Sequence, residues 1–387
     1  MQPVSVVDPG RWLPFFWQLP VCLWLLLMPL AAGAGEGCLV GFDVGSSGVR
    51  AGADHLEKIA RVKIDYLEDV WPDNRIDVTN EASIAAFREL PKEIGVSGSC
   101  AAVAGGYSAW RHAMEKGRPT DVAATLATFR QRTGVHFFVI PQEVEGGYAY
   151  LAAQRILKER LQTPFVLDIG GGSMQFASLR NGWGAPLGQK SWRKRFCQSV
   201  KQLADPNCAP NPVGEGAWQQ TIKILDQEVT AARERLGKGL RVTAISSTVV
   251  REIHPVLRLL APAGGEVDEN GFGRRALAEA IRRLSTLDDA GILAALDNCR
   301  SIDARPTCDP GHVATFVTDM LLLHAFLEGL SIDRIEVGAA DVNNVPGILA
   351  DTRPRAWIPH YQCYLTRLQS AGIGAFLSDP GTCPPER

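Results

Sequence analysis

The stretch that most constrains this chain runs from Asp168 to Ser173 and reads Asp-Ile-Gly-Gly-Gly-Ser. Apolar residues at 165–167 precede it and residues 174–177 follow it, a pattern that predicts two strands joined by a glycine turn. Because glycine has no Cβ, the backbone N–H groups of such a turn can converge on an oxyanion. An aspartate at the strand end can hold a hydrated divalent cation beside it. A single glycine run is more often an ordinary hairpin turn, so the stretch alone leaves both interpretations open.

A second copy of this arrangement lies near the start, where residues 39–42 lead into Asp43-Val-Gly-Ser-Ser-Gly48. Two such loops indicate two related half-domains that share one phosphate. Each half then alternates predicted strands with predicted helices, for example helices at 81–94, 120–133 and 142–161, whereas 183–212 looks irregular. We therefore expect an α/β fold with a cleft between two domains, at 38–160 and 161–350, and a C-terminal tail at 351–387.

The first 35 residues are expected to lie outside that fold. Arg11 precedes a largely apolar run, and Ala32-Gly33-Ala34 is typical of a signal-peptidase site. Segment 1–35 therefore predicts export, to the periplasm or another extracytoplasmic compartment. An uncleaved N-terminal membrane anchor is the alternative, since the apolar run approaches spanning length.

The cysteines agree with export. The chain has nine, of which Cys22 lies in the N-terminal segment, and an even number in an exported chain indicates disulfides. Short loops and paired strand starts suggest Cys38–Cys100, Cys197–Cys208, Cys299–Cys308 and Cys363–Cys383. Eight cysteines allow 105 pairings, so this connectivity is a hypothesis. A zinc site is the competing interpretation, but C-x-x-C spacing does not occur.

Several motifs in order resemble the exopolyphosphatase and guanosine pentaphosphate phosphohydrolase (Ppx/GppA) family. They are residues 41–50, the Ser108-Ala-Trp-Arg-His-Ala113 segment, residues 139–150, residues 166–173, and Pro186-Leu-Gly188 followed by Arg195-Phe196. The likeness covers 38–196 well and continues in patches to about 349. It implies the actin-like fold group, with two ribonuclease H-like domains and a phosphate-binding cleft between them.

Phosphoanhydride chemistry gives these residues roles. The resemblance implies that Glu145 is the catalytic base, with Glu143 a weaker candidate. Asp43 and Asp168 are the candidate ligands of Mg²⁺. The candidate phosphate ligands are Gly45, Ser46, Ser47, Arg50, Arg111, Gly170, Gly171, Gly172 and Ser173. Without the family context, Glu145 is better explained as a first-turn helix acid favoured by the helix dipole, and Arg50 and Arg111 could be ordinary surface arginines.

The sequence departs from the family at three places. Gln175 stands where the family signature has an acidic residue, and Ser246-Ser247-Thr248 replaces a Gly-Gly-Thr segment. Residues 338–342 replace an arginine-bearing segment. An amide cannot replace a carboxylate as a magnesium ligand of equal strength.

The leading hypothesis is a magnesium-dependent phosphohydrolase in which water removes the terminal phosphate of polyphosphate or a related phosphoanhydride, with polyphosphate or a phosphorylated nucleotide as the substrate. A binding protein that senses phosphate or polyphosphate is the first alternative, and an ATP-dependent member of the same fold group is the second. The net charge of −2 argues against nucleic-acid binding. We expect membrane contact only through the N-terminal segment, and a homodimer is possible on the family resemblance.

Overall fold

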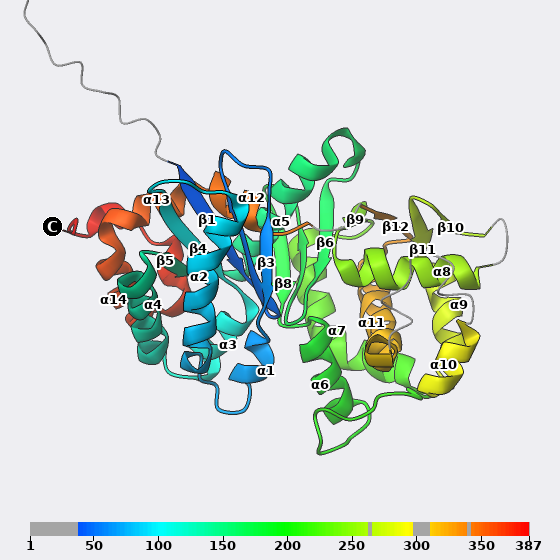
Figure 1. The fold of residues 1–387 in the computed structure, drawn as a ribbon. Coiled ribbons are helices and arrows are strands. Elements are labelled where there is room, and N and C mark those ends of the chain that lie inside the picture. Colours follow the sequence, from blue (N-terminus) through cyan, green and yellow to red (C-terminus); the bar gives the residue numbers. More distant parts are fainter. Residues whose placement is uncertain (1–37, 262–264, 297–309, 339–341, 387) are drawn as a thin grey trace, which may run out of the picture. The chain divides into compact units, whose positions relative to one another are not determined.

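In a computed structural model, the described residues are 38–261, 265–296, 310–338 and 342–386. The expected signal or anchor at 1–35 lies outside them, as do Cys299 and Cys308. From Cys38 onwards the chain forms one compact unit, which is built on two sheets (Figure 1). None of the helices in the described ranges is both long enough and apolar enough to cross a membrane.

The first sheet holds the N-terminal loop. Its strands are β1 Leu39–Val44, β2 Gly48–Ala53, β3 Ala60–Lys63, β4 Ala101–Gly106 and β5 His136–Val139, in the order β3-β2-β1-β4-β5. Tight turns make β1, β2 and β3 antiparallel, whereas β4 and β5 run parallel to β1 after helical crossovers. Every residue of β1 is buried, as expected for a central strand covered on both faces.

The second sheet repeats this order. Its strands are β6 Phe165–Ile169, β7 Met174–Ala177, β8 Gly182–Ala185, β9 Val242–Ala244, β10 Val267–Asp268, β11 Gly271–Gly273 and β12 Arg334–Val337. The run β8-β7-β6-β9-β12 has the same order and directions as the first sheet, and β11 and β10 extend it beyond β12. This antiparallel meander followed by parallel strands is the ribonuclease H-like arrangement, so the predicted fold class is confirmed.

Helices surround both sheets (Figure 1). They are α1 Tyr66–Val70, α2 Asn80–Ile94, α3 Ser108–Lys116, α4 Pro119–Thr133, α5 Gln142–Leu157, α6 Gln189–Ser199, α7 Ala217–Leu236, the π-helix Thr248–Ile253, α8 His254–Leu260, α9 Arg274–Leu284, α10 Asp289–Ala295, α11 Pro310–Gly329, α12 Val345–Ala350, α13 Thr352–Trp357 and α14 Tyr361–Ala371. The prediction of irregular structure at 183–212 was wrong for β8 and α6. The glycine content of β8 and the basic composition of α6 suggested a loop, although Trp192, Phe196 and Cys197 of α6 have helical spacing and are buried.

Two helices are exchanged between the sheets. α5 follows the first sheet in sequence but packs on β7 and β8 of the second, while α12 follows the second sheet and packs on β1. α5 and α12 also pack on each other. Glycines permit these close contacts: a Cβ on Gly146 would lie 2.8 Å from Cβ of Ala177, and one on Gly347 would lie 2.3 Å from Cβ of Tyr148. These crossings bring the ends of β1 and β6 together.

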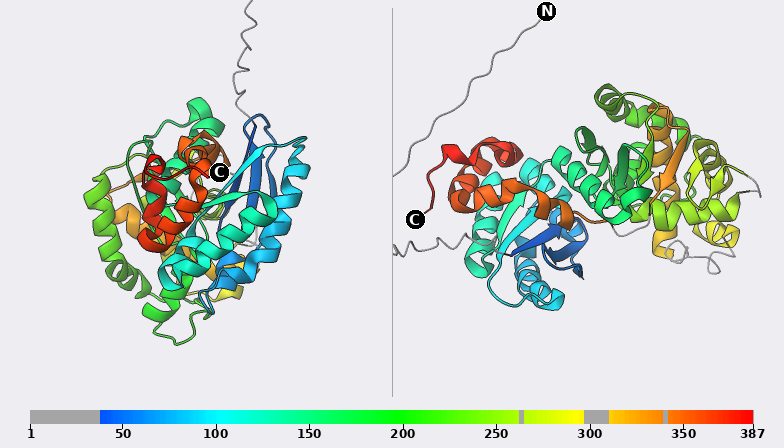
Figure 2. Two further views of the ribbon diagram at one scale, coloured as in Figure 1. Left: turned by 90° about the vertical axis from the view of Figure 1, so that its left-hand side faces the viewer. Right: turned by 90° about the horizontal axis from the view of Figure 1, so that it is seen from above.

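The C-terminal segment belongs to the hydrophobic core of the first sheet. Trp357, Tyr361, Tyr364 and Phe376 are buried with side chains of β1, β4 and β5. Figure 2 shows these orange and red helices lying against the blue and cyan elements. The expected divisions at residues 160 and 350 stay predictions, since residues from 38 on form a single compact unit.

Three of the proposed disulfides are present among the described residues. They join Cys38 to Cys100, Cys197 to Cys208 and Cys363 to Cys383. The first links the starts of β1 and β4, as the sequence suggested. Disulfides of this kind are compatible with an exported protein.

Candidate functional site

The first loop connects β1 to β2 and places Asp43 at its entrance. The backbone N–H of Gly45 donates to the carbonyl oxygen of Gly48 over 3.0 Å, which closes the turn. Asp43 is buried, and its Oδ2 accepts from Nη1 of Arg50 at 3.4 Å and from the backbone N of Asn344 at 3.1 Å. Asn344 immediately precedes α12, so the chain's return to the first sheet fixes this carboxylate.

The second loop connects β6 to β7 and is supported from behind by α6. The backbone N–H of Gly170 donates to the carbonyl oxygen of Ser173 at 2.9 Å. Gln189 and Lys190, the first residues of α6, donate backbone N–H groups to the carbonyls of Gly170 and Gly171. Gly188 lies so close that a Cβ there would be 2.3 Å from the oxygen of Gly170. The Pro186-Leu-Gly188 segment therefore buttresses the glycine loop.

The two loops lie close together and both line one cavity of about 470 Å³. A Cβ on Gly171 would lie 2.4 Å from Oγ of Ser46, and one on Gly172 would lie 2.6 Å from Oγ of Ser108. Only glycine allows this approach without moving the serines. The predicted residues that line the cavity are Asp43, Gly45, Ser46, Ser47, Arg50, Glu145, Asp168, Gly170, Gly171, Gly172 and Ser173.

Arg111, the remaining predicted phosphate ligand, lies behind this lining in a buried network. Its Nη2 donates to Oε2 of Glu145 at 2.6 Å and to Oγ of Ser173 at 3.3 Å, and its Nη1 donates to the carbonyl of Ile140 at 3.0 Å. The amide nitrogen of Gln175 donates to the same Oε2 and Oγ atoms, at 2.9 Å each. Arg111 thus contacts the candidate base and a loop serine rather than the open cavity.

Burial and neighbouring charges raise the pKa of two acids of the site, Glu145 and Asp168. Burial is the main cause that raises the pKa of Glu145, while the charge of Arg111 lowers it and that of Asp43 raises it. Burial, together with the charges of Glu145 and Asp43, raises the pKa of Asp168 to about 7. The side chain of Asp168 is largely surrounded by protein, but part of it is exposed to the cavity. A cation beside these carboxylates would relieve their repulsion.

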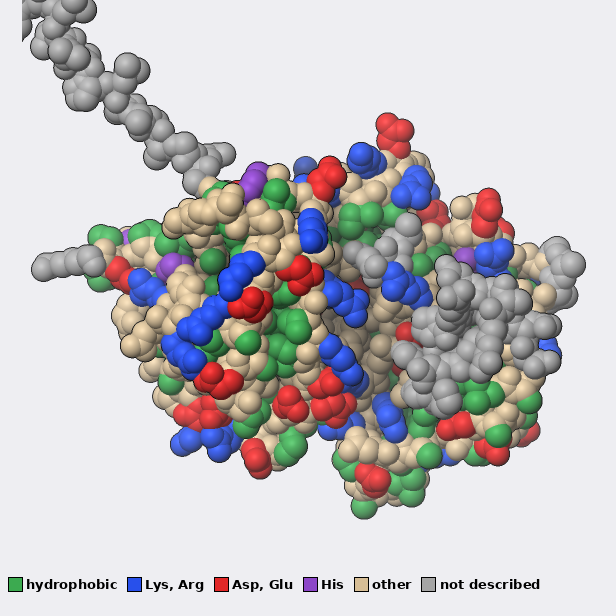
Figure 3. All heavy atoms as spheres, in the orientation of Figure 1, with side chains coloured by type: hydrophobic (Ala, Val, Ile, Leu, Met, Phe, Trp, Pro, Cys, Tyr) green, Lys and Arg blue, Asp and Glu red, His purple; other side chains and the backbone are tan. Residues whose placement is uncertain are grey.

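Basic residues that the sequence analysis missed border the cavity. Arg61, Lys63, Lys190 and Arg251 line it together with Arg50, and Figure 3 shows Lys and Arg side chains gathered around the hollow on this face. Lys190 also lies 3.4 Å from Asp65 and 3.6 Å from Glu68 of α1. The alternation of Arg61 and Lys63 on β3 was a signal that could have indicated them.

Several polar residues of the second half were also missed. Gln189, Ser246, Ser247, Glu252 and Asn343 line the cavity. Residues 246–247 were noted only as a departure from a Gly-Gly-Thr pattern. They follow β9, which is parallel to β6, and ends of adjacent parallel strands meet at one edge of a sheet.

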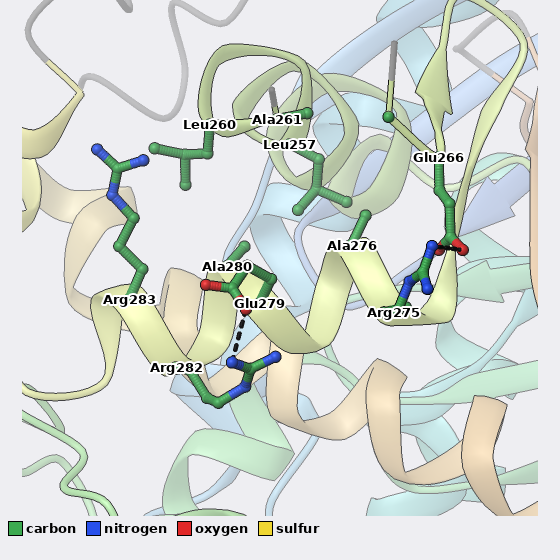
Figure 4. Close-up of a pocket in the computed structure, with 11 residues that line it drawn as sticks. Leu257, Leu260, Ala261, Glu266, Arg275, Ala276, Glu279, Ala280, Arg282 and Arg283 are labelled. Carbon is green, nitrogen blue, oxygen red and sulfur yellow. Dashed lines mark ion pairs between the residues drawn. The ribbon is translucent and has the colours of Figure 1, made fainter. Parts of the chain in front are cut away.

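A second cavity of similar volume lies between α8 and α9 (Figure 4). Its floor is apolar, with Leu257, Leu260 and Ala280. Two of its arginines are engaged in ion pairs, Arg275 with Glu266 at 2.8 Å and Arg282 with Glu279 at 2.6 Å. It contains none of the loop residues, so the cavity between the loops is the candidate site.

The fold and this cavity define an α/β protein whose two ribonuclease H-like halves contribute matching Asp–Gly loops to one site. No family model matches the chain. An uncharacterized protein of Streptomyces coelicolor is 29% identical over 234 residues, a match that covers 56% of this chain and 65% of the relative.

Solved structures share the fold over most of the chain. A Ppx/GppA family member from Aquifex aeolicus matches with a TM-score of 0.57 and 17% identity, over 81% of this chain and 96% of that chain. An exopolyphosphatase from Cytophaga hutchinsonii matches with a TM-score of 0.55 and 12% identity, over 82% and 98%. An exopolyphosphatase-like protein matches with a TM-score of 0.56 and 17% identity, over 82% and 99%. This chain has the fold of the Ppx/GppA structures, which confirms the resemblance at the level of the fold.

Proposed function

We propose that this chain is a phosphohydrolase that removes the terminal phosphate of polyphosphate or a related phosphoanhydride, with water as nucleophile. The observation that carries the proposal is the meeting of both Asp–Gly loops with Glu145 in one cavity. Phosphoryl transfer to water needs an anion cradle, a positioned base and charge neutralisation, and these residues offer each of them. The fold shared with structures named as a Ppx/GppA phosphatase and an exopolyphosphatase supports the same reaction class.

The loops would hold the terminal phosphate. Ser46 of the first loop and Ser173 of the second both line the cavity and can offer hydroxyl donors. Arg50 is only weakly tied to Asp43, at 3.4 Å, and its side chain is 40% exposed. It can therefore swing to a phosphate oxygen and pair with it. The basic border of the cavity would attract the rest of a polyanionic substrate.

Glu145 would take the proton from the attacking water. Its Oε2 is fixed by Arg111 and Gln175, whereas its Oε1 forms no hydrogen bond with any described residue and Glu145 lines the cavity. Burial raises its pKa above the ordinary value of a glutamate, which brings it nearer to neutral pH, where a base works best.

Asp43 and Asp168 would hold magnesium, directly or through its water shell. Within the described ranges no group of three or more His, Cys, Asp or Glu side chains is placed to bind a metal ion. This fits magnesium, which takes one or two carboxylates and keeps several waters, better than metals that need a full protein cage. When bound, the cation would neutralise charge on the phosphoryl oxygens.

A phosphate-binding sensor without turnover is the second candidate, and Gln175 favours it. In the signature that this chain resembles, that position is acidic. Here an amide occupies it and donates to the candidate base, so a carboxylate that could help to hold magnesium or water is missing. The cavity and its anion donors remain.

The test is phosphate release from polyphosphate by the purified, oxidised protein with magnesium present, comparing Glu145→Gln with Glu143→Gln. Glu143 lies on the same helical turn but is exposed, so it is a matched control. We expect the Glu145 variant to lose activity by a factor of about 10² to 10⁴ and the Glu143 variant to retain it.

Three outcomes separate the candidates. Equal loss in both variants would reject Glu145 as the base. A wild type that releases no phosphate but is stabilised against heat by polyphosphate would favour the sensor. Neither release nor stabilisation would reject both proposals.

A further inference from the structure

Gln175 lies between the candidate base and the glycine loop. It is 2% exposed and sits on β7 directly opposite Asp168 of β6. Its side-chain nitrogen lies 2.9 Å from Oε2 of Glu145 and 2.9 Å from Oγ of Ser173. Because an ionised carboxylate only accepts hydrogen bonds, the amide must present its nitrogen to Glu145, which settles its orientation chemically.

Two nitrogen atoms, one of Gln175 and one of Arg111, donate to the same pair of oxygen atoms. The two hydrogens on the Gln175 nitrogen point to Oε2 of Glu145 and Oγ of Ser173. Nη2 of Arg111 donates to the same two atoms. Each acceptor therefore receives two hydrogen bonds, one from a guanidinium and one from an amide.

The hydrogen bonds that Ser173 already accepts determine which further hydrogen bond its hydroxyl group can form. A serine oxygen has two lone pairs and one hydrogen, and both lone pairs are engaged here. The hydrogen finds no acceptor among the described residues. Ser173 lines the cavity, so its hydroxyl can serve as a donor to a ligand there. A carboxylate at position 175 would reverse this, because the hydroxyl would then donate to it.

We propose that Gln175 is a positioning residue that makes Ser173 a hydrogen-bond donor toward the cavity and so favours, at this point, an oxyanion that carries no proton. The binding part of this inference stands independently of turnover, while its consequence for catalysis rests on the proposed function. Sulfate and inorganic phosphate are suitable probes, because sulfate carries no proton near neutral pH and phosphate carries at least one.

Other charged and titratable groups face the same cavity and act on both anions. Asp43 of β1, Asp168 of β6, Tyr107, Arg50 and Lys190 line it, and Arg111 of α3 lies directly behind the lining. The informative quantity is therefore the change between variants in the ratio of the two dissociation constants, measured with magnesium at one pH.

The experiment is isothermal titration of the full-length, oxidised protein with each anion, for the wild type, Gln175→Glu and Gln175→Met. In Gln175→Glu the Ser173 hydroxyl donates to residue 175. Its oxygen can then accept a hydrogen bond from protonated phosphate, but the hydroxyl cannot donate one to sulfate. We expect the ratio of the sulfate to the phosphate dissociation constant to rise about tenfold, the effect of exchanging one hydrogen bond. In Gln175→Met both anions should weaken by similar factors. Gln154→Glu, which adds the same charge on the exposed face of α5, is the control and should leave the ratio unchanged.

Each result bears on the inference. An unchanged ratio in Gln175→Glu overturns it, as does a wild type that binds neither anion. If Gln175→Glu fails to fold, wild-type affinities in Gln175→Met overturn it as well. A confirmed shift in ratio without any phosphate release would support the positioning role while rejecting the hydrolase. Where turnover exists, the acid limb of the pH–rate profile of Gln175→Glu should move upward, because residues 145 and 175 would share a proton.

Discussion

Gly171 shows how a single residue sets the distance between the two loops. Its α-carbon faces Ser46 of the other loop, and a Cβ would lie 2.4 Å from Oγ and 3.3 Å from Cβ of that serine. The obstructing atom is the tip of a small side chain that can rotate. A larger residue at position 171 would therefore displace the Ser46 hydroxyl more than it would destabilise the fold.

Gly171→Ala is expected to weaken phosphate binding about tenfold or more while changing the free energy of unfolding by less than about 1 kcal/mol. Gly147→Ala is the control, because nothing lies within 4 Å of its Cβ position. That variant should bind normally and be slightly more stable, since alanine favours the helix. Titration with inorganic phosphate and urea unfolding would measure the two quantities. Wild-type affinity in Gly171→Ala would show that the Ser46 hydroxyl does not contact the anion.

At the scale of elements, α14 protects the edge of the first sheet. β5 is the last strand in that sheet, so one row of its backbone groups lacks a neighbouring strand. The hydroxyl of Tyr361 accepts from the backbone N of Phe137 at 3.0 Å and donates to its carbonyl at 2.9 Å. The hydroxyl of Tyr364 accepts from the backbone N of Val139 at 2.8 Å. The Cys363–Cys383 disulfide ties this helix to the chain end.

Tyr361→Phe should destabilise the protein by about 1–3 kcal/mol, because it leaves a buried N–H and a buried carbonyl without partners. Tyr150→Phe is the comparison, as Tyr150 is partly buried and forms no hydrogen bond with a described residue. Urea unfolding monitored by circular dichroism would give both values. Equal stabilities would mean that water replaces the lost partner at the sheet edge.

At the scale of the whole molecule, buried acids in the second half couple stability to pH. The side-chain nitrogen of Gln189 donates to Oε2 of Glu252 at 3.2 Å and to Oδ2 of Asp319 at 3.0 Å. Burial raises the pKa of Glu252 to about 7. Burial and the charge of Glu252 raise the pKa of Asp319 well above its usual range. Folding therefore favours the protonated form of this pair.

Because folding raises the pKa of Glu252, the free energy of unfolding should fall as the pH rises. Below the unfolded pKa of about 4.5 Glu252 is protonated in both states, and as pH rises through 7 the folded state must ionise a buried group. The contribution of Glu252 to the free energy of unfolding should fall across this window by roughly 2–3 kcal/mol. Buried His324 acts in the opposite direction, because burial lowers its pKa to about 4.

Glu252→Gln should therefore flatten the fall in stability between pH 5 and 8 relative to the wild type, while exposed Glu269→Gln should not. Urea unfolding at several pH values would provide the difference between variant and wild type, in which the histidine contribution cancels. A constant difference over this range would show that Glu252 has an ordinary pKa.

The sequence by itself determined much of the local structure. The Asp–Gly loops, the strands beside them, α2 with Gly95 at its end and α4 with Gly134 are encoded by turn chemistry and hydrophobic periodicity, which are local properties. The pairs Cys38–Cys100, Cys197–Cys208 and Cys363–Cys383 also followed from spacing and predicted strand positions. Asp43, Glu145 and Asp168 were named from the sequence, and the structure brings them to one cavity.

Only the tertiary structure decided how these pieces work together. Glycine-rich β8 is a strand because it pairs with β7, and the basic helix α6 packs on α11, which the composition of these segments did not indicate. The packing of α12 on β1 and α5, and the pairing of the C-terminal tyrosines with β5, join residues more than 180 positions apart. The ring of Arg111, Glu145, Ser173 and Gln175 also depends on the tertiary structure, because its members come from three separate segments: α3, α5 and the β6–β7 hairpin. Hydrogen bonds between distant side chains leave no periodic trace in a sequence, and for that reason the role of Gln175 could be inferred only from the fold.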